Sequence, residues 1–303
     1  MKNRCKILTV IGILIAGSTL FYGCDSQNSE KVNETKLEKS NEKSGIQKEY
    51  LDDGSKEEFY LKDGKKNGEA KRTYPNGDVE EFKYVAGIRE GKATITYLDP
   101  TENGIYKATY TYINGQKNGL AQSEGKECNE KFSYLNDIKH GEAEYTFSEG
   151  VLKYNYYNGM KQGRATFIRN DGDIIEFEYK DDLPEGRAIR KYFNGNIEEY
   201  SYIKGKKQGA AKIKRELDGN EIIESFTYID NVKQGKATID SFDYSEEFEY
   251  INGEKHGLAK SKKNIDGNEI VEEFSYVNGV KGGPAKTTDS FGNIEEYNYV
   301  NGK

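Results

Sequence analysis

The stretch FSYVNGVKGGPA at residues 274–285 is one copy of a twelve-residue motif that recurs along most of this chain of 303 residues. Other clear copies are FKYVAGIREGKA at 82–93, YTYINGQKNGLA at 110–121, FSYLNDIKHGEA at 132–143 and FEYINGEKHGLA at 248–259. The copies follow one another roughly every 22–28 residues, and a period of that size is typical of repeat arrays rather than of one conventional globular domain.

A glycine recurs in every copy, two residues before an alanine, and we predict it to be a turn glycine. These turn glycines are Gly68, Gly91, Gly119, Gly141, Gly163, Gly186, Gly209, Gly235, Gly257 and Gly283. Four residues before each of them stands Gly, Asn or Asp, the residues that enter positive φ at the lowest cost. Because Asn or Asp often precedes this earlier position, the sequence predicts a two-residue hairpin turn in each repeat.

Aromatic residues alternate with other residues just before each predicted turn, as in Phe82 and Tyr84. A period of two places both rings on one face of a β-strand. A second turn, such as Asn76-Gly77, then closes the unit. We therefore expect an all-β fold, an elongated single-layer antiparallel β-meander of about ten stacked hairpin repeats.

The motif resembles the MORN repeat, a family whose glycine-rich and aromatic hairpins stack into an extended single-layer sheet. The resemblance is carried by N-G-x-K-x-G, by KHG at 139–141 and 255–257, and by the Tyr- or Phe-containing strand that follows. It covers roughly residues 50–303 and is closest to the bacterial MORN-like variants, among them the YwqK-type antitoxins. The resemblance implies that the hairpins are MORN-like and suggests an immunity or antitoxin role as one alternative.

The composition favours a thin sheet over a thick globular core. Hydrophobic residues make up 34% of the chain and charged residues 32%, yet 24 Tyr and 13 Phe are too many for a disordered chain. A one-layer sheet reconciles these values because each strand needs only one semi-apolar face. The net charge of −7 disfavours nucleic acid as a partner, since binding nucleic acid requires a basic face.

Charged residues also recur at fixed places in the motif. Two residues before the turn glycines stand cations, with Pro184 as the exception: Lys66, Arg89, Lys117, Lys139, Lys161, Lys207, Lys233, Lys255 and Lys281. Glutamate pairs precede many aromatic pairs: Glu80/Glu81, Glu198/Glu199, Glu246/Glu247, Glu272/Glu273 and Glu295/Glu296. We predict a basic ridge and a separate acidic band, and interpret both as solvated surface that keeps the array soluble. The alternative is a charge-selective binding ridge.

The N-terminal residues have the pattern of an export signal. Basic residues precede the apolar run ILTVIGILIAGSTL at 7–20, and Cys24 follows it. We predict a lipoprotein signal peptide at 1–23 and lipidation of Cys24, the alternative being an uncleaved membrane anchor. The polar residues 24–45 are predicted to be a disordered tether, and the repeat array is expected at 46–303. The protein would thus be exported and anchored by lipid to the bacterial cell envelope, at the inner or the outer membrane.

The sequence contains no recognisable catalytic motif, and we predict no catalytic residue, metal site or cofactor. His140 and His256 occupy a motif position that other repeats fill with Asn, Gln, Glu or Gly, which indicates a solvent-facing turn position. The repeated glutamate pairs along an open sheet favour a charged stripe over the two-carboxylate cleft of a glycosidase. No nucleophile and base stand in a recognisable arrangement.

The leading hypothesis is therefore a non-enzymatic, membrane-tethered binding or scaffold module with a protein partner. Its candidate binding face is the tyrosine row Tyr84, Tyr112, Tyr134, Tyr156, Tyr179, Tyr202, Tyr228, Tyr250 and Tyr276. The equally weighted alternative is that these rings only hold the sheet together. The last strand is also predicted to expose an edge, which would allow self-association.

Overall fold

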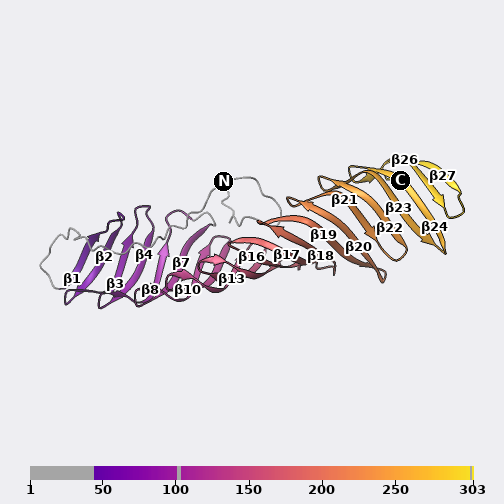
Figure 1. Cartoon of the computed structure of the whole chain (residues 1–303). Helices are drawn as coiled ribbons and strands as arrows, with labels where there is room; N and C mark the ends of the chain where they lie inside the picture. Colours follow the sequence, from indigo (N-terminus) through magenta and orange to yellow (C-terminus); the bar gives the residue numbers. More distant parts are fainter. Residues whose placement is uncertain (1–43, 101–103, 301) are drawn as a thin grey trace. The chain divides into compact units, whose positions relative to one another are not determined.

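A computed structural model describes residues 44–100, 104–300 and 302–303, and every regular element in them is a β-strand (Figure 1). The predicted signal peptide, Cys24 and almost all of the predicted tether lie outside the described residues. The described chain divides into two units, 1–160 and 161–303, and each is treated by itself below.

In the first unit the strands pair antiparallel in chain order. They are β1 (Gly45–Tyr50), β2 (Lys56–Lys62), β3 (Lys65–Thr73), β4 (Val79–Val85), β5 (Ile88–Arg89), β6 (Gly91–Thr96), β7 (Ile105–Ile113), β8 (Gln116–Lys117), β9 (Gly119–Gly125), β10 (Cys128–Leu135), β11 (Ile138–Lys139), β12 (Gly141–Phe147) and β13 (Gly150–Tyr157), with β14 (Met160–Lys161) at the unit boundary. The short strands β5, β8 and β11 are the first residues after a tight turn.

The second unit follows the same pattern of antiparallel neighbours. Its strands are β15 (Gly163–Arg169), β16 (Ile174–Lys180), β17 (Leu183–Lys191), β18 (Ile197–Ile203), β19 (Lys206–Leu217), β20 (Asn220–Ile229), β21 (Val232–Asp240), β22 (Tyr244–Ile251), β23 (Glu254–Ile265), β24 (Asn268–Val277), β25 (Val280–Lys281), β26 (Gly283–Asp289) and β27 (Ile294–Tyr299). The predicted all-β fold, an open antiparallel β-meander of stacked hairpins, is confirmed.

The tight turns have the backbone conformation that the sequence predicts. Asp63 and Gly64 have φ of 52° and 76°, and Asn136 and Asp137 have φ of 50° and 69°. Positive φ at both central residues defines a type I′ turn, whose twist matches that of the two strands it joins. The Gly, Asn or Asp at the second turn position is therefore explained by backbone geometry.

The predicted turn glycines adopt positive φ, from 72° to 81°, but they do not lie in the tight turns. They lie four residues later, at a β-bulge. Between β2 and β3, Phe59 pairs with Ala70 but Leu61 pairs with Lys66, so the β3 strand carries extra residues around Gly68. The glycine conformation was thus predicted correctly and its structural context was wrong.

Backbone hydrogen bonds join each tight turn to the preceding repeat. The Gly115 N–H donates to the Arg89 carbonyl at 3.0 Å, and the Gly253 N–H donates to the Lys233 carbonyl at 3.0 Å. Equivalent bonds of 2.7–3.1 Å recur at the other turns, so neighbouring repeats are joined beyond the strand pairs themselves. Because these bonds use the backbone alone, they tolerate the variation of turn residues seen along the chain.

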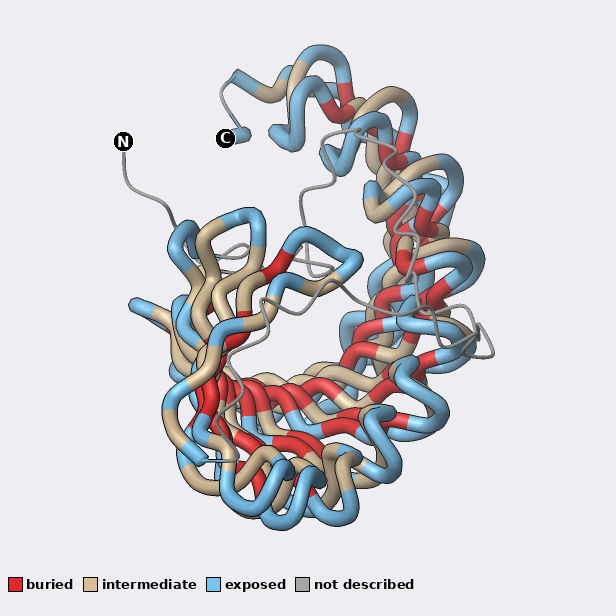
Figure 2. Tube along the Cα trace, turned by 90° about the vertical axis from the view of Figure 1, so that its left-hand side faces the viewer, coloured by how far each residue is buried: buried red, intermediate tan, exposed pale blue. Residues whose placement is uncertain are grey.

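The two faces of each unit differ in burial. One face, called the aromatic face here, carries the Phe/Tyr pairs and the alanine that follows each bulge, as where Ala93 pairs with Tyr110. These alanines are 1–7% exposed. The opposite face, called the outer face, carries charged residues such as Glu81 and Lys83, both exposed. Figure 2 shows the buried stretches recurring in successive hairpins while the turns stay exposed.

Candidate functional site

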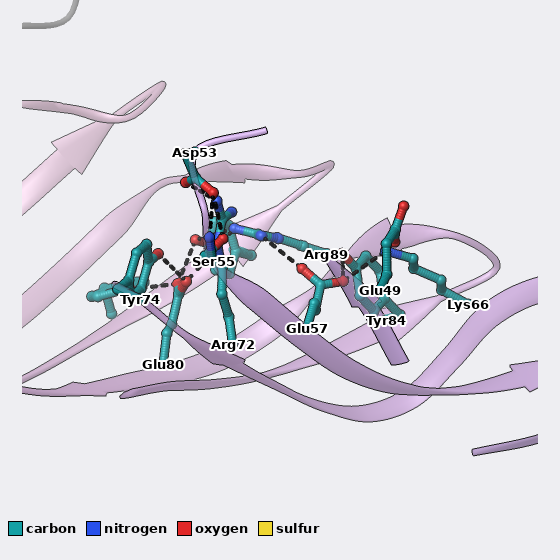
Figure 3. Close-up of polar contacts among 12 residues, drawn as sticks. Glu49, Asp53, Ser55, Glu57, Lys66, Arg72, Tyr74, Glu80, Tyr84 and Arg89 are labelled. Atoms are coloured by element: carbon teal, nitrogen blue, oxygen red, sulfur yellow. Dashed lines mark hydrogen bonds and ion pairs between the residues drawn. The ribbon is translucent and has the colours of Figure 1, made fainter. Parts of the chain in front are cut away.

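Most repeats contain a buried carboxylate cluster on the aromatic face. In the second unit, Glu224 is 3% exposed and accepts hydrogen bonds from the Tyr250 hydroxyl at 2.6 Å and the Lys233 ammonium at 2.5 Å. In the first unit, Glu57 is 1% exposed and accepts from Tyr84 at 2.9 Å and Lys66 at 2.7 Å (Figure 3). We call each such set of one glutamate, its tyrosines and its cation a carboxylate cluster.

The cluster recurs because its members occupy fixed motif positions. The glutamate lies two residues before the first aromatic residue, and the cation lies nine residues after the glutamate. The glutamates with these partners are Glu57, Glu80, Glu130, Glu198, Glu224, Glu246 and Glu272. Alternation explains their placement, since residues two apart on a strand share a face.

A third hydroxyl often completes the cluster. The Tyr74 hydroxyl, which lies just after β3, donates to Glu80 at 2.8 Å, and the Tyr192 hydroxyl donates to Glu198 at 2.9 Å. The cation covers the aromatic rings as well: Lys207 Nζ lies 3.8 Å from the Tyr200 ring centre and 4.7 Å from that of Tyr228. Each cation therefore combines an ion pair with cation–π contacts to two successive repeats.

Two of the clusters illustrate how a buried carboxylate is kept ionised. Burial alone would raise the pKa of Glu224, but hydrogen bonds from Lys233 and Tyr250 outweigh it and hold the pKa below its ordinary value. The pKa of Glu130 is lowered in the same way, with Lys139 and two tyrosines opposing the effect of burial. A buried charge is tolerated here because it is fully hydrogen-bonded and paired.

The predicted basic ridge and acidic band are wrong as solvated surfaces. The Lys207 side chain is only 13% exposed and that of Lys233 only 19%. The glutamate pairs are split by strand alternation, because Glu80 points into the aromatic face and is 1% exposed whereas Glu81 lies exposed on the outer face. Four of the ten glutamates in the predicted band, Glu80, Glu198, Glu246 and Glu272, thus belong to the clusters, whereas Glu295 and Glu296 are both exposed.

The structure places the predicted tyrosine row within this packing. Eight of its nine members are 2–8% exposed, and Tyr134 is half-buried. The rings meet edge to face, as between Phe248 and Tyr250 with ring centres 5.1 Å apart. The rings therefore hold the sheet together, as the alternative hypothesis stated, while a binding role for them stays a prediction.

Three repeats lack the glutamate. Ile175 replaces it in β16, where Pro184 also replaces the cation, and both residues are buried. Leu152 replaces it in β13, nine residues before Lys161. Ala108 replaces it in β7, where Lys117 is retained. These exchanges are visible in the sequence, but they can be recognised as losses of a cluster carboxylate only after the structure has shown the clusters.

The outer face of the second unit carries two adjoining grooves that share Leu258 and Glu273. Leu258 is 84% exposed and stands among charged residues of neighbouring strands. One groove is lined by Lys236, Ala237, Thr238, Glu247, Phe248, Glu249, Leu258, Ala259, Lys260 and Glu273. An exposed leucine ringed by lysines and glutamates is the composition of a protein-binding surface with an apolar centre and a polar rim.

Apolar residues also flank the tight turns on the outer face. In the first unit this turn-edge row consists of Val85, Ile88, Ile113, Leu135, Ile138, Tyr157 and Met160, which are 41–59% exposed. In the second unit it consists of Leu183, Ile203, Ile229, Val232, Ile251, Val277 and Val280, which are 39–55% exposed. The row arises because these residues alternate with the buried tyrosines, as where Val85 follows Tyr84 and pairs with Ile88.

The two histidines were predicted to occupy a solvent-facing turn position, but they lie half-buried beside the bulges, and the His140 ring lies 5.6 Å from that of Tyr157. Within residues 44–100, 104–300 and 302–303, no group of three or more His, Cys, Asp or Glu could hold a metal ion. The same part of the chain contains no helix long and apolar enough to cross a membrane.

Comparison with protein families identifies MORN repeats in this chain. The MORN repeat model matches residues 60–79, 133–151, 155–174 and 178–197. Each match spans parts of a hairpin described above, so the sequence resemblance is confirmed for these four repeats. No curated protein matches the chain. The MORN repeats indicate a repeat-based binding module, a type of repeat that is generally non-enzymatic.

Proposed function

We propose that this protein is a non-enzymatic, membrane-tethered repeat protein that acts as a binding or scaffold module of the bacterial cell envelope. The observation that carries the binding role is the pair of grooves around Leu258 on the outer face. On the aromatic face the rings are packed against one another and covered by cations, whereas Leu258 is 84% exposed. The outer face therefore offers the accessible apolar centre that a partner protein needs.

Charged ladders on both sides of Leu258 support a protein partner. Lys236 pairs with Glu249 across β21 and β22, and Lys260 pairs with Glu273 across β23 and β24. Alternating charges of this kind orient a partner and discriminate against partners of the wrong charge pattern. The partner would thus be a protein segment with an apolar anchor and mixed charges, rather than a nucleic acid.

The test compares Leu258→Ser with Leu217→Ser as the matched control. Leu217 is also a leucine of the second unit, 61% exposed at a hairpin end and outside both grooves. Tagged full-length proteins are expressed in the host, cross-linked and purified, and the captured envelope proteins are quantified. We expect L258S to lose one specific partner while L217S retains it. Equal capture by both variants would contradict the proposed surface.

The tether is a separate element of the proposal. It is supported by the basic start, the apolar run and the position of Cys24 in the sequence. We expect the wild-type protein to incorporate labelled palmitate and to sediment with membranes, and Cys24→Ser to lose both properties. A C24S protein that remains in the membrane fraction without label would favour the uncleaved anchor instead.

Self-association and the antitoxin role are weaker alternatives. β27 pairs with β26 and has no second partner strand among the described residues, which keeps self-association through this edge a prediction. Sedimentation equilibrium of the full chain over a range of concentrations tests it. The antitoxin role has no observation in its favour, because the matched family model is the general MORN repeat.

A further inference from the structure

One carboxylate cluster of the first unit lacks its carboxylate but keeps all its donors. Ala108 occupies the glutamate position in β7, between Ile95 of β6 and Ser123 of β9. Lys117 lies nine residues later, at the cation position, and its Nζ is 4.4 Å from the Tyr110 ring centre and 5.5 Å from that of Tyr134. The ammonium is therefore placed as in the complete clusters, where a glutamate accepts from it.

Two tyrosine hydroxyls belong to the same position. Tyr134 corresponds to Tyr156, whose hydroxyl donates to Glu130 at 2.7 Å in the next cluster of the first unit. Tyr97 corresponds to Tyr74, whose hydroxyl donates to Glu80, because each precedes its own glutamate position across a hairpin loop. Burial raises the pKa of Tyr134 above its ordinary value, and the electrostatic influence of Tyr97 adds to this rise.

These three donors have no acceptor among the residues that the structure describes. No hydrogen bond or ion pair joins the Tyr97 hydroxyl, the Tyr134 hydroxyl or the Lys117 ammonium to another described group. Every fully buried side-chain polar atom in the same part of the chain has a partner. The two hydroxyls must therefore reach solvent, which agrees with Tyr134 being the one half-buried member of the tyrosine row.

We propose that Tyr97, Lys117 and Tyr134 form a binding site for a short aliphatic carboxylate, which takes the position that a glutamate side chain fills in the other clusters. The replacement of glutamate by alanine keeps the Cβ carbon and removes one methylene group and the carboxylate, which together correspond to acetate. Propionate, one carbon longer, matches the whole glutamate side chain. Two hydroxyls and an ammonium then supply the donors for the two oxygens. The aromatic rings beside them would contact the methylene groups.

Propionate itself is the probe. Titration of the full-length protein with [1-¹³C]propionate is expected to give a saturable shift of the carboxylate resonance, and propionamide is expected to give no binding. At a propionate concentration about tenfold above the dissociation constant, Tm should rise by roughly 2–4 °C. Absence of a saturable shift with the wild-type protein would overturn the proposal.

Two variants test the site from opposite directions. Ala108→Glu supplies the chain's own carboxylate, so it should raise Tm without ligand and abolish propionate binding. Lys117→Met removes the cation and should also abolish binding, without filling the site. If either variant binds propionate as well as the wild type does, the carboxylate lies elsewhere and the proposal is wrong.

A matched site can be made in the second unit. Glu224→Ala leaves Lys233, Arg215 and Tyr250 around an alanine, one cation more than at Ala108, and should lose stability that propionate partly restores. Loss of stability without any restoration would count against the proposed geometry.

The origin of the carboxylate is addressed with a capped Gly-Glu-Gly peptide. Binding of this peptide as tightly as propionate would assign the site to an acidic side chain of a partner, and its exclusion would assign the site to a free small acid. Gly-Gln-Gly serves as the uncharged control. Binding of both peptides alike would show that the carboxylate is not recognised, and this outcome would overturn the proposal.

Discussion

Two incomplete clusters of the array, at Ala108 in the first unit and at Ile175 in the second, differ in what they leave behind. At Ile175 both charges are gone, since Pro184 replaces the cation, and Ile175 is 0% exposed. The Tyr202 hydroxyl there has the Tyr200 hydroxyl as a partner at 3.2 Å. At Ala108 only the carboxylate is missing. At Ile175 the position is thus filled by an apolar side chain with neither charge present, whereas at Ala108 the small alanine leaves the cation without a carboxylate.

Backbone hydrogen bonding explains why proline is accepted at 184. The Lys207 N–H donates to Asn231 Oδ1 of the next turn at 2.7 Å, and the Lys117 N–H donates to Asp137 Oδ1 at 2.8 Å. The next turn after Pro184 has Gly205 at that place, which has no side chain to receive such a bond. At this repeat, three groups are therefore missing together: the side-chain cation, the backbone N–H of residue 184, and the side-chain acceptor in the next turn.

The largest effect that would sharpen this comparison is expected from Ile175→Glu. The new carboxylate would be fully buried beside the paired hydroxyls of Tyr200 and Tyr202, with Pro184 in place of a cation. We expect a loss of about 4 kcal/mol in the free energy of unfolding, measured by urea denaturation. Ala108→Glu is the control, since the same new side chain is expected to stabilise there. Destabilisation of similar size at both positions would remove the distinction between them.

Removal of a carboxylate from a complete cluster should be the next largest effect. Glu198→Ala leaves Lys207 and Tyr228 without their acceptor, and we expect a loss of about 3 kcal/mol. The double variant Glu198→Ile with Lys207→Leu imitates the repeat at Ile175 and should recover most of this loss. Hydrogen exchange of β18–β20 measures the local stability. A double variant no more stable than the single one would argue against paired replacement.

The stability of a complete cluster should depend on pH through its ionised carboxylate. The pKa of Glu224 is lowered from 4.5 in the folded protein, so the folded state binds fewer protons than the unfolded state below that pH. Its contribution is therefore complete above about pH 4.5 and is lost as the pH falls through the folded pKa. We expect Tm of the wild type to fall more steeply than that of Glu224→Gln between pH 5 and pH 3. Parallel curves would contradict the lowered pKa.

The smallest effect is expected from Lys117→Met. Because no carboxylate depends on Lys117, its removal should cost only the cation–π contacts, about 0.5 kcal/mol. Lys207→Met should cost several times more, since Glu198 would remain buried without its cation. Urea denaturation of the two variants side by side provides the measurement. A large loss of unfolding free energy in K117M would show that Lys117 already has an acceptor in the protein, which would contradict the proposed carboxylate site.

The hairpins could be predicted because glycine, Asn and Asp report backbone conformation directly. Positions with positive φ are occupied by a small set of residue types that can be recognised in the sequence, as at Asn136-Asp137. The bulge was less visible, because Gly68 also needs positive φ and nothing in its identity separates a bulge from a turn. Strand periodicity similarly predicted the shared face of Phe82 and Tyr84 from their spacing alone.

The carboxylate clusters were within reach of the same reasoning and were missed. Alternation places Glu80 on the face of Phe82 and Tyr84, and the two-residue turn places Arg89 directly opposite Tyr84. Alternation does not predict how far a side chain is buried. A glutamate on a one-layer sheet is expected to be solvated, and its burial follows only from the rings and cations of the next repeat that cover it. The partners come from strands some 30 residues away, as in Tyr110 and Glu80.

The backbone bonds between successive turns have a consequence for how such a chain evolves. Because each repeat is attached to the one before it through carbonyl and amide groups, a whole repeat can be deleted or duplicated without redesigning its neighbours. Recombination can therefore change the length of the array in single steps. A repeat that carries a variant position such as Ala108 can then be gained, lost or duplicated as one unit while the other repeats stay the same.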